Sequence, residues 1–188
     1  FDAQGYRRNV YIKIPITQPV VFTKSYKTPQ ITIPPYVLGC LLGDGFLGAE
    51  DNLRTVIGEK ELGDIKEMQS YFEEDGCDWF DYHEADRGYL STKGDDKQYL
   101  IDELHRLNLY GLRSQDKFIP EPYMYLPIDQ RFKLVQGLLD TDGYAGDLTK
   151  CSGEYCSTSK KLAEQVTWLL RSLGAYASIS DKPSPYYR

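Results

Sequence analysis

One short pattern, which occurs twice, constrains the fold of this 188-residue chain more than any other feature. Residues 37–45 and residues 135–143 each carry a glycine inside an apolar run that closes with an aspartate and a glycine. The second copy begins 98 positions after the first. Apolar runs of this kind are typical of buried helices, and the closing glycine is a helix stop signal. The two copies therefore predict two similar helices, each ending at an acid.

The same shift of 98 positions relates more than the two helices. It places Gly39 on Gly137, Asp44 on Asp142, and Met68, Tyr71, Phe72 and Gly76 on Val166, Leu169, Leu170 and Gly174. No gap is needed between the first helix and the glycine that ends the second one. A period this long excludes a solenoid of stacked repeats and predicts two structurally equivalent halves.

The segments between these landmarks predict an α+β fold of two αββαββ(α) halves. The elements expected in the first half are a helix at 36–44, strands at 53–58 and near Glu59, a helix at 64–75, a hairpin at 79–82 and 88–92, and a helix at 97–109. Residues 1–35 are rich in proline and predict an extended arm or linker. The first half with a connecting segment then covers 36–130, and the second half, 131–188, ends inside its second hairpin.

Small residues on both helices predict how the halves meet. The small residues, spaced four apart on each helix, are Gly39 and Gly43 on the first and Gly137 and Thr141 on the second. Missing or short side chains on one face let two helix backbones approach closely. Packed in this way around a pseudo-twofold axis, the helices would bring Asp44 and Asp142 together at their C-terminal ends.

Two carboxylates at helix C-termini need a compensating positive charge, because the helix dipole is negative there and the acids repel each other. A divalent cation supplies that charge. Mg²⁺ takes oxygen ligands and is typically held by one or two carboxylates together with substrate phosphate. We therefore expect Mg²⁺, for which Mn²⁺ or Ca²⁺ can substitute in binding, and hydrolysis of phosphodiesters.

Plainer interpretations compete with this metal centre. A single Asp-Gly pair after a helix is usually only a turn, and it is the repetition that argues against this. A calcium loop starting at Asp140 would need its glycine at the sixth position and a glutamate where Cys151 stands, so this interpretation fails. Cys151 and Cys156 have the wrong spacing for a zinc knuckle.

At this point the residues resemble a known family. Both stretches resemble the LAGLIDADG motif of homing endonucleases, and residues 115–120 resemble the Lys-x-Ile-Pro block that intein-borne members carry between the two motifs. The lead-in at 9–36 is similar to the segment that joins an intein's splicing domain to its endonuclease. Residues 157–174 resemble the helix block after the second motif. The resemblance covers nearly the whole chain.

The resemblance implies a monomeric, site-specific endonuclease with internal pseudo-twofold symmetry. Two saddle-shaped antiparallel sheets would grip double-stranded DNA, which is cut on both strands across the minor groove. Asp44 and Asp142 would hold the metal. Gly43 and Thr141 would complete the surroundings of the metal. Lys117 would polarise the attacking water or stabilise the negative charge that develops on the phosphate. Taken alone, Lys117 is more often a surface lysine before a turn.

Two departures from the family pattern bear on activity. Leu42 replaces the acid of the sixth motif position, which the second copy keeps as Asp140. Lys117 has no counterpart in the second half, since a shift of 98 would carry it past residue 188. The site that cuts one of the two DNA strands would therefore lack this lysine. A catalytically weak or nicking DNA-binding module of the same fold is therefore the alternative function.

A partner as negative as DNA requires the basic residues to gather on one surface, because the chain's formal net charge is −6. Residues expected to contact DNA from the concave sheet faces or adjoining loops are Arg54, Lys60, Arg87, Tyr89, Ser91, Lys93, Lys150, Ser157 and Lys182. Each of them alone is more often a solvated surface residue than a base contact. Phosphates would set the affinity and base edges the sequence preference.

The chain has no run of about 18 apolar residues, which predicts a soluble intracellular protein, cytoplasmic or encoded by a phage or virus, with no membrane partner. A host protein is a further expected partner if the chain belongs to an intein. A purely structural spacer within an intein is the remaining rival. That rival predicts no affinity for nucleic acid at any ionic strength.

Overall fold

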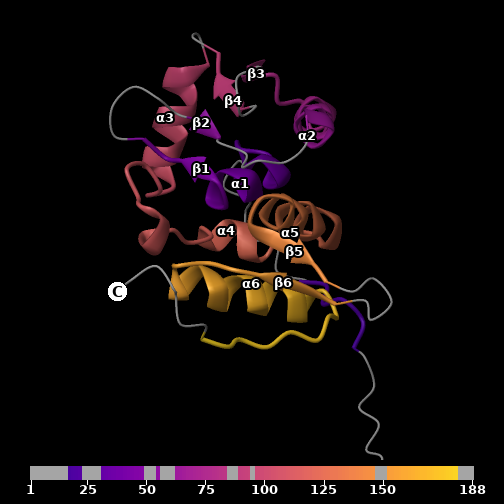
Figure 1. Ribbon diagram of the computed structural model, residues 1–188. Helices are drawn as coiled ribbons and strands as arrows, with labels where there is room; N and C mark the ends of the chain where they lie inside the picture. Colours follow the sequence, from indigo (N-terminus) through magenta and orange to yellow (C-terminus); the bar gives the residue numbers. More distant parts are fainter. Residues whose placement is uncertain are drawn as a thin grey trace, which may run out of the picture.

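The computed structural model describes residues 17–22, 31–48, 54–55, 62–83, 89–93, 96–146 and 152–181. In chain order the elements are α1 (Pro35–Leu42), β1 (Gly45–Phe46), β2 (Arg54–Thr55), α2 (Leu62–Glu74), β3 (Phe80–His83), β4 (Tyr89–Thr92), α3 (Lys97–Arg106), a 3₁₀ turn (Ser114–Asp116), α4 (Glu121–Met124), α5 (Ile128–Asp142), β5 (Gly143–Ala145), β6 (Gly153–Tyr155) and α6 (Lys160–Ser172). Helices and antiparallel strands combine into an α+β fold. In Figure 1, α1 and α5 lie in the middle, between the first sheet with α2 and α3 and the second sheet with α6.

The first sheet has the strand order β1-β2-β4-β3, and every neighbouring pair is antiparallel. β3 pairs with β4 from Phe80 opposite Thr92 to His83 opposite Tyr89, which confirms the predicted hairpin. α2 and α3 follow the predicted helices closely. α2 buries Met68 and Phe72, and its chain then turns at Gly76, whose φ is +74°.

The start of this sheet differs from expectation. α1 ends at Leu42, two residues earlier than predicted, and the first strand begins at Gly45 instead of residue 53. The chain folds back sharply here: a Cβ on Gly45 would lie only 2.2 Å from the main-chain oxygen of Leu41. Only glycine fits this reversal. Gly45 therefore lets the chain turn back and begin a strand against α1. β2 takes part of the predicted first strand, and the strand expected near Glu59 lies outside the described residues.

The second sheet contains β5 and β6, with Gly143 opposite Tyr155. α6 begins and ends 98 positions after α2, so the shift seen in the sequence also relates the bounds of these two helices. The second hairpin expected in this half is not formed by residues 175–181, which contain no strand. A strand needs a pairing partner for its main-chain groups. The positions equivalent to β4 lie outside the described part of the chain.

α1 and α5 pack with their main chains in contact. Every residue of α1 is buried. A Cβ on Gly39 would lie 2.4 Å from the main-chain oxygen of Leu134, and a Cβ on Gly137 would lie 2.2 Å from that of Tyr36. Both distances are far shorter than any real Cβ contact. Glycine at both positions is therefore what allows the two helix axes to come this close.

A side-chain link crosses the same interface. The Tyr36 hydroxyl donates a hydrogen bond to the Asp140 carboxylate over 2.9 Å. Burial, then the neighbouring Cys40 and Asp140, raise the pKa of Tyr36, so this hydroxyl stays protonated and available as a donor. The acid at the sixth position of the second motif copy thus ties α5 to the first turn of α1.

Residues 17–22, within the predicted arm, lie against the C-terminal end of α6. The Val20 main-chain N–H donates to the Ser172 carbonyl over 2.8 Å, and the Phe22 ring stacks on Trp168. Arg131 is fully buried and donates to the carbonyl oxygens of Leu126 and Val20. Its charge thereby joins the arm to the start of α5. No helix among the described residues is both long and apolar enough to span a bilayer.

Replacing Gly137 with alanine tests the helix contact. The new methyl group would strike a main-chain atom of α1, so we expect Gly137→Ala to lower the free energy of unfolding by about 3 kcal/mol, although alanine favours a helix by about 1 kcal/mol. Urea unfolding measures the change. The matched control is Gly153→Ala, where the nearest atom would lie 3.4 Å away, and which we expect to cost much less. Equal losses in both variants would contradict close backbone packing.

Candidate catalytic centre at the ends of two packed helices

Asp44 and Asp142 stand at the C-terminal ends of the two packed helices. Asp142 is the last residue of α5, and Asp44 follows α1 by two residues. A Cβ on Gly43 would lie 1.9 Å from the Thr141 hydroxyl oxygen and 3.6 Å from one carboxylate oxygen of Asp142. The Asp142 carboxylate therefore lies beside the residue that precedes Asp44. Both aspartates are partly exposed, so a substrate can reach them.

Thr141 contributes packing at this point. Its hydroxyl donates within α5, with the carbonyl oxygens of Gly137 and Leu138 at 2.9 and 3.0 Å, and the residue is 8% exposed. The hydroxyl fills the space left open by Gly43. Thr141 thus belongs, by its contacts, to the helix interface.

Lys117 reaches this centre from the segment between the 3₁₀ turn and α4. Its ammonium donates to three main-chain carbonyl oxygens: Gly43 at 2.7 Å, Gly45 at 2.8 Å and Leu41 at 3.2 Å. Carbonyl groups at a helix C-terminus lack helical partners and carry the negative end of the dipole. A buried cation is therefore well placed here, and the lysine is only 3% exposed.

The two aspartates and the lysine are electrostatically coupled. Burial lowers the pKa of Lys117 to about 8, and the carboxylates of Asp142 and then Asp44 oppose that shift. Both acids are therefore near enough to the amine to favour its charged form. With a pKa near 8, the amine can hold or release a proton close to neutral pH, as a general acid or base must.

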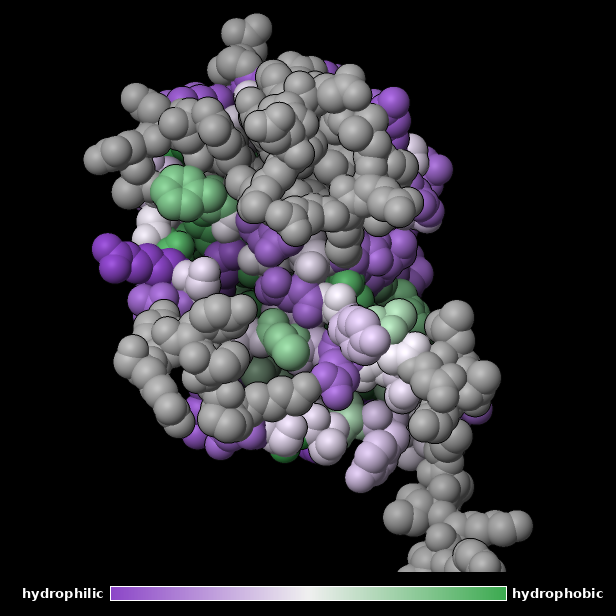
Figure 2. Space-filling view, in the orientation of Figure 1, coloured by the Kyte–Doolittle hydropathy of each residue, from purple (hydrophilic) through white to green (hydrophobic). Residues whose placement is uncertain are grey.

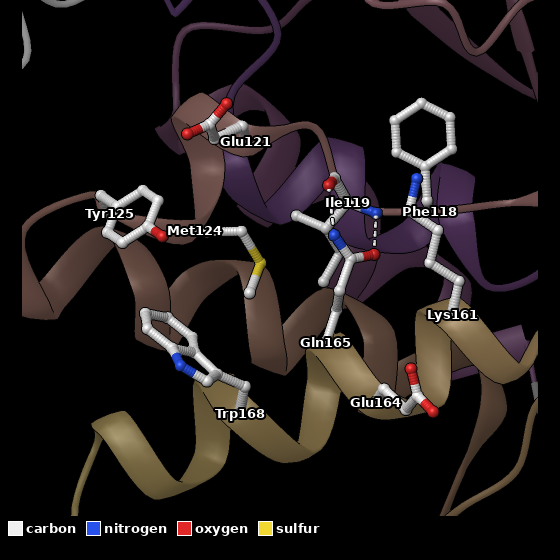
Figure 3. A pocket seen from close by; sticks show the side chains of 9 residues that line it. All are labelled: Phe118, Ile119, Glu121, Met124, Tyr125, Lys161, Glu164, Gln165 and Trp168. Carbon is white, nitrogen blue, oxygen red and sulfur yellow. Dashed lines mark hydrogen bonds between the residues drawn. The ribbon is translucent and has the colours of Figure 1, made fainter.

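The segment that carries Lys117 is held in place by α6. The Ser159 hydroxyl caps this helix by accepting from the Leu162 N–H, and it donates to the Lys117 carbonyl over 2.7 Å. The Gln165 side chain bonds both main-chain groups of Ile119, at 2.8 and 2.7 Å (Figure 3). A serine before an amphipathic helix is a cap signal in the sequence. The hydrogen bond of Ser159 to Lys117, 42 positions away, leaves no such signal in the sequence.

Tyr155 is a further neighbour of this centre, besides Ser159 and Gln165, that the sequence did not predict. It lies on β6 directly opposite Gly143, the residue after Asp142. Burial, then Asp142, and further Asp44, raise the pKa of its hydroxyl, while Ser157 lowers it. Tyr155 therefore lies within electrostatic reach of both acids. Ser157, one of the predicted DNA contacts, is partly buried beside it.

The structure places part of the predicted DNA-contact set. Arg54 on β2 lies opposite Ser91 on β4, and Tyr89 is on the same strand as Ser91; only the main chain of these three residues is described. Lys93 follows β4, and its N–H donates to the Trp79 carbonyl over 2.7 Å. The remaining members lie outside the described residues: Lys60, Arg87, Lys150 and Lys182. On the face shown in Figure 2, hydrophilic residues gather across the middle of the molecule.

The donor set suits a hard cation. Within the described ranges, no three histidine, cysteine, aspartate or glutamate residues cluster as a metal site would require. The carboxylates of Asp142 and Asp44 both lie within electrostatic reach of Lys117, whose ammonium bonds the Gly43 carbonyl oxygen. Mg²⁺ is typically bound by one or two carboxylates and keeps several waters, so this set fits it, whereas it is too small for a zinc site.

Comparisons with known proteins relate parts of the chain to a family and to one longer protein. Residues 129–188, which cover α5, β5, β6 and α6, match the LAGLIDADG-like domain family. Over 152 residues, or 78% of the chain, the sequence is 28% identical to the ATP-dependent DNA helicase Hel308 of Methanocaldococcus jannaschii. The chain spans 12% of that protein's length. Over these residues the chain is thus similar to the LAGLIDADG-like domain family, in agreement with the resemblance of its second motif copy.

The pKa of Lys117 predicts how stability depends on pH. The folded protein binds this proton below about pH 8, whereas the unfolded chain keeps it up to about pH 10.5. Between these values the unfolded state binds more protons, so the free energy of unfolding rises with pH. The cost of burying the charge is complete below pH 8 and is relieved as the pH approaches 10.5.

Comparison with Lys117→Met isolates this effect, because the tyrosines and other titrating groups are common to both proteins. Methionine leaves three carbonyl groups without a donor, which lowers stability by an amount that does not depend on pH. From pH 7.5 to 10.5, we expect the wild-type protein to gain on the order of 3 kcal/mol over the variant. Urea unfolding across this range provides the measurement. A constant difference would show that the buried amine keeps its ordinary pKa.

Proposed function

We propose that this chain is a LAGLIDADG homing endonuclease domain that cuts double-stranded DNA at a specific site with the help of Mg²⁺. The observation that carries the proposal is the convergence of Asp44, Asp142 and Lys117 at the ends of α1 and α5. Two acids and a buried amine suit the hydrolysis of a phosphodiester. That reaction needs an activated water and stabilisation of negative charge on the phosphate.

In this proposal each residue has a defined task. Asp44 and Asp142 would hold Mg²⁺, with the Gly43 carbonyl oxygen beside them, and the bound ion would lower the pKa of water and neutralise charge on the phosphate. Lys117 faces the same place. Its neutral amine can accept a proton from the attacking water, and its ammonium can steady the oxygen that becomes negative.

The 98-residue shift supports a two-half enzyme. It relates not only the two motif copies but also the bounds of α2 and α6. A DNA duplex has two antiparallel strands, so each half would present one aspartate to one strand. We propose that a single chain suffices for both cuts, without a second copy. Lys117 bonds the carbonyl groups of Leu41, Gly43 and Gly45, on the Asp44 side of the centre, so the two strands should be cut at unequal rates.

We further propose that the domain is of the intein-associated type. The Lys-x-Ile-Pro block around Lys117 is one support, because intein-borne members of the family carry such a block between the two motifs. Hydrogen bonds from Ser159 and Gln165 hold its main chain against α6. A match to 12% of a much longer polypeptide is the pattern expected of a domain carried within another protein. The host protein would then be the further partner.

Cleavage of DNA by substituted proteins tests the proposal. A pool of plasmids carrying random inserts, incubated with the protein and Mg²⁺, would be screened for linear and nicked products. We expect Asp44→Asn and Asp142→Asn each to lower cleavage of the recovered plasmid at least about 100-fold, because the amide keeps the shape but loses the charge that a metal needs. The matched control is Asp129→Asn, an exposed acid in the first turn of α5.

Three measurements separate the possible results. Calorimetry with Mg²⁺ reports metal binding, which both motif variants should weaken and Asp129→Asn should not. DNA binding without metal should survive both substitutions. Nicked plasmid as the final product would favour the weak or nicking module over the full endonuclease. Unchanged cleavage by both motif variants would refute the assignment of the centre.

A further inference from the structure

We propose that Phe46 and Tyr144 form a matched pair of aromatic contacts to the DNA duplex, one from each half, at the nucleotides beside the aspartates. The inference rests on the proposed function and deepens it. Neither ring belongs to the residues assigned to the metal, to Lys117 or to the predicted basic contacts. The two rings would set how the duplex is held and distorted at the point of cleavage.

The two residues occupy equivalent positions. Phe46 is the second residue after Asp44, and Tyr144 is the second residue after Asp142, so the shift of 98 relates them too. Both lie on the short strand that leaves the end of a central helix, β1 in one half and β5 in the other. Two residues of extended chain span roughly 7 Å, which places each ring next to its aspartate.

Both rings are turned outward. Phe46 is 52% exposed, although Gly45 and Leu47 on either side of it are buried. Successive side chains of a strand point to opposite faces, so Phe46 points away from the core. Tyr144 is 70% exposed. Single exposed rings such as Tyr176 are normal on a protein surface. Phe46 and Tyr144 differ in that they occupy equivalent positions beside the same centre, which points to a shared partner.

The charges around these rings indicate what they contact. Asp44 and Asp142 are two residues away, and Glu154 lies directly opposite Tyr144 on β6. In the other half, Arg54 lies directly opposite Phe46 on β2, so the charges beside the two rings differ while the rings themselves are neutral. Neutral rings can hold a nucleotide by its other surfaces, the sugar and the base, because stacking and apolar contact need no positive charge.

A duplex is the occupant that the position favours. A duplex that presents one strand to each aspartate must pass within two residues of both rings. Proteins that approach the minor groove commonly insert apolar side chains between base steps and kink the duplex there. Pyrimidine–purine steps unstack most easily. The rings would thus favour flexible steps at the cleavage point and add specificity without hydrogen bonds to bases.

Four alanine variants test this. Phe46→Ala and Tyr144→Ala remove the rings. The matched controls are Phe132→Ala, also 52% exposed but on α5 about 15 Å along the helix from Asp142, and Tyr176→Ala, 98% exposed beyond α6. The probe is a labelled pool of random 40-base-pair duplexes, bound in the absence of divalent metal. Fluorescence anisotropy gives the dissociation constant, and circular dichroism checks the fold.

We expect each ring deletion to weaken binding roughly 5- to 100-fold, with both controls within about twofold of wild type. The dependence of binding on salt should not change, because no phosphate contact is lost. Tyr144→Phe should bind like wild type, since the ring and not the hydroxyl makes the contact. Wild-type affinity in both ring variants would overturn the proposal.

The outcomes also separate this inference from the proposed function. If the wild-type protein binds duplexes and needs both rings but releases no product with Mg²⁺, the endonuclease assignment fails and the ring contact stands. If it cuts and the ring variants bind normally, only the ring contact fails. A change in self-association with unchanged DNA affinity, seen by sedimentation, would assign the rings to a second copy of the chain and overturn the proposal. Absence of any duplex binding would overturn both.

Discussion

The contact between the main chains of α1 and α5 is the constraint on which the rest of this structure depends. Gly39 and Gly137 face the opposite helix with no side chain between the backbones. Any Cβ there would push the helices apart, and the helix ends would separate with them. The meeting of Gly43 with Thr141, and hence the placing of Asp44 beside Asp142, follows from the absence of two methyl groups.

Charge is the second constraint at the same place. Two acids and several carbonyl groups without helical partners converge there, and burial of the Lys117 ammonium balances part of that negative potential. The Lys117 amine therefore has a structural role and a role in the proposed chemistry. Its bonds fix the turn that follows α1, and its lowered pKa makes proton transfer possible. The cation comes from the segment between the 3₁₀ turn and α4, whereas each motif copy supplies one of the acids.

Patterns of local origin were predictable from the sequence. α2, α3 and the β3–β4 hairpin follow from periodicity and from glycine stops such as Gly76, and the repeat of 98 anticipated a helix equivalent to α2 at the position of α6. Features that depend on distant neighbours were not. The strand at Gly45 exists because the chain must fold back against Leu41. Residues 175–181 form no strand, whereas the corresponding segment of the first half pairs as β3 with β4.

The sequence by itself determined the duplicated pattern, the two acids and the lysine as the residues to examine, because these depend on residue identity and spacing. Only the tertiary structure decided that Ser159 and Gln165 hold the lysine segment, that Tyr155 lies beside the acids, and that Phe46 and Tyr144 face solvent. Each of these relations joins residues far apart in the chain, or depends on which side of a short strand faces the core. Such relations are fixed by packing in three dimensions, which local propensity does not encode.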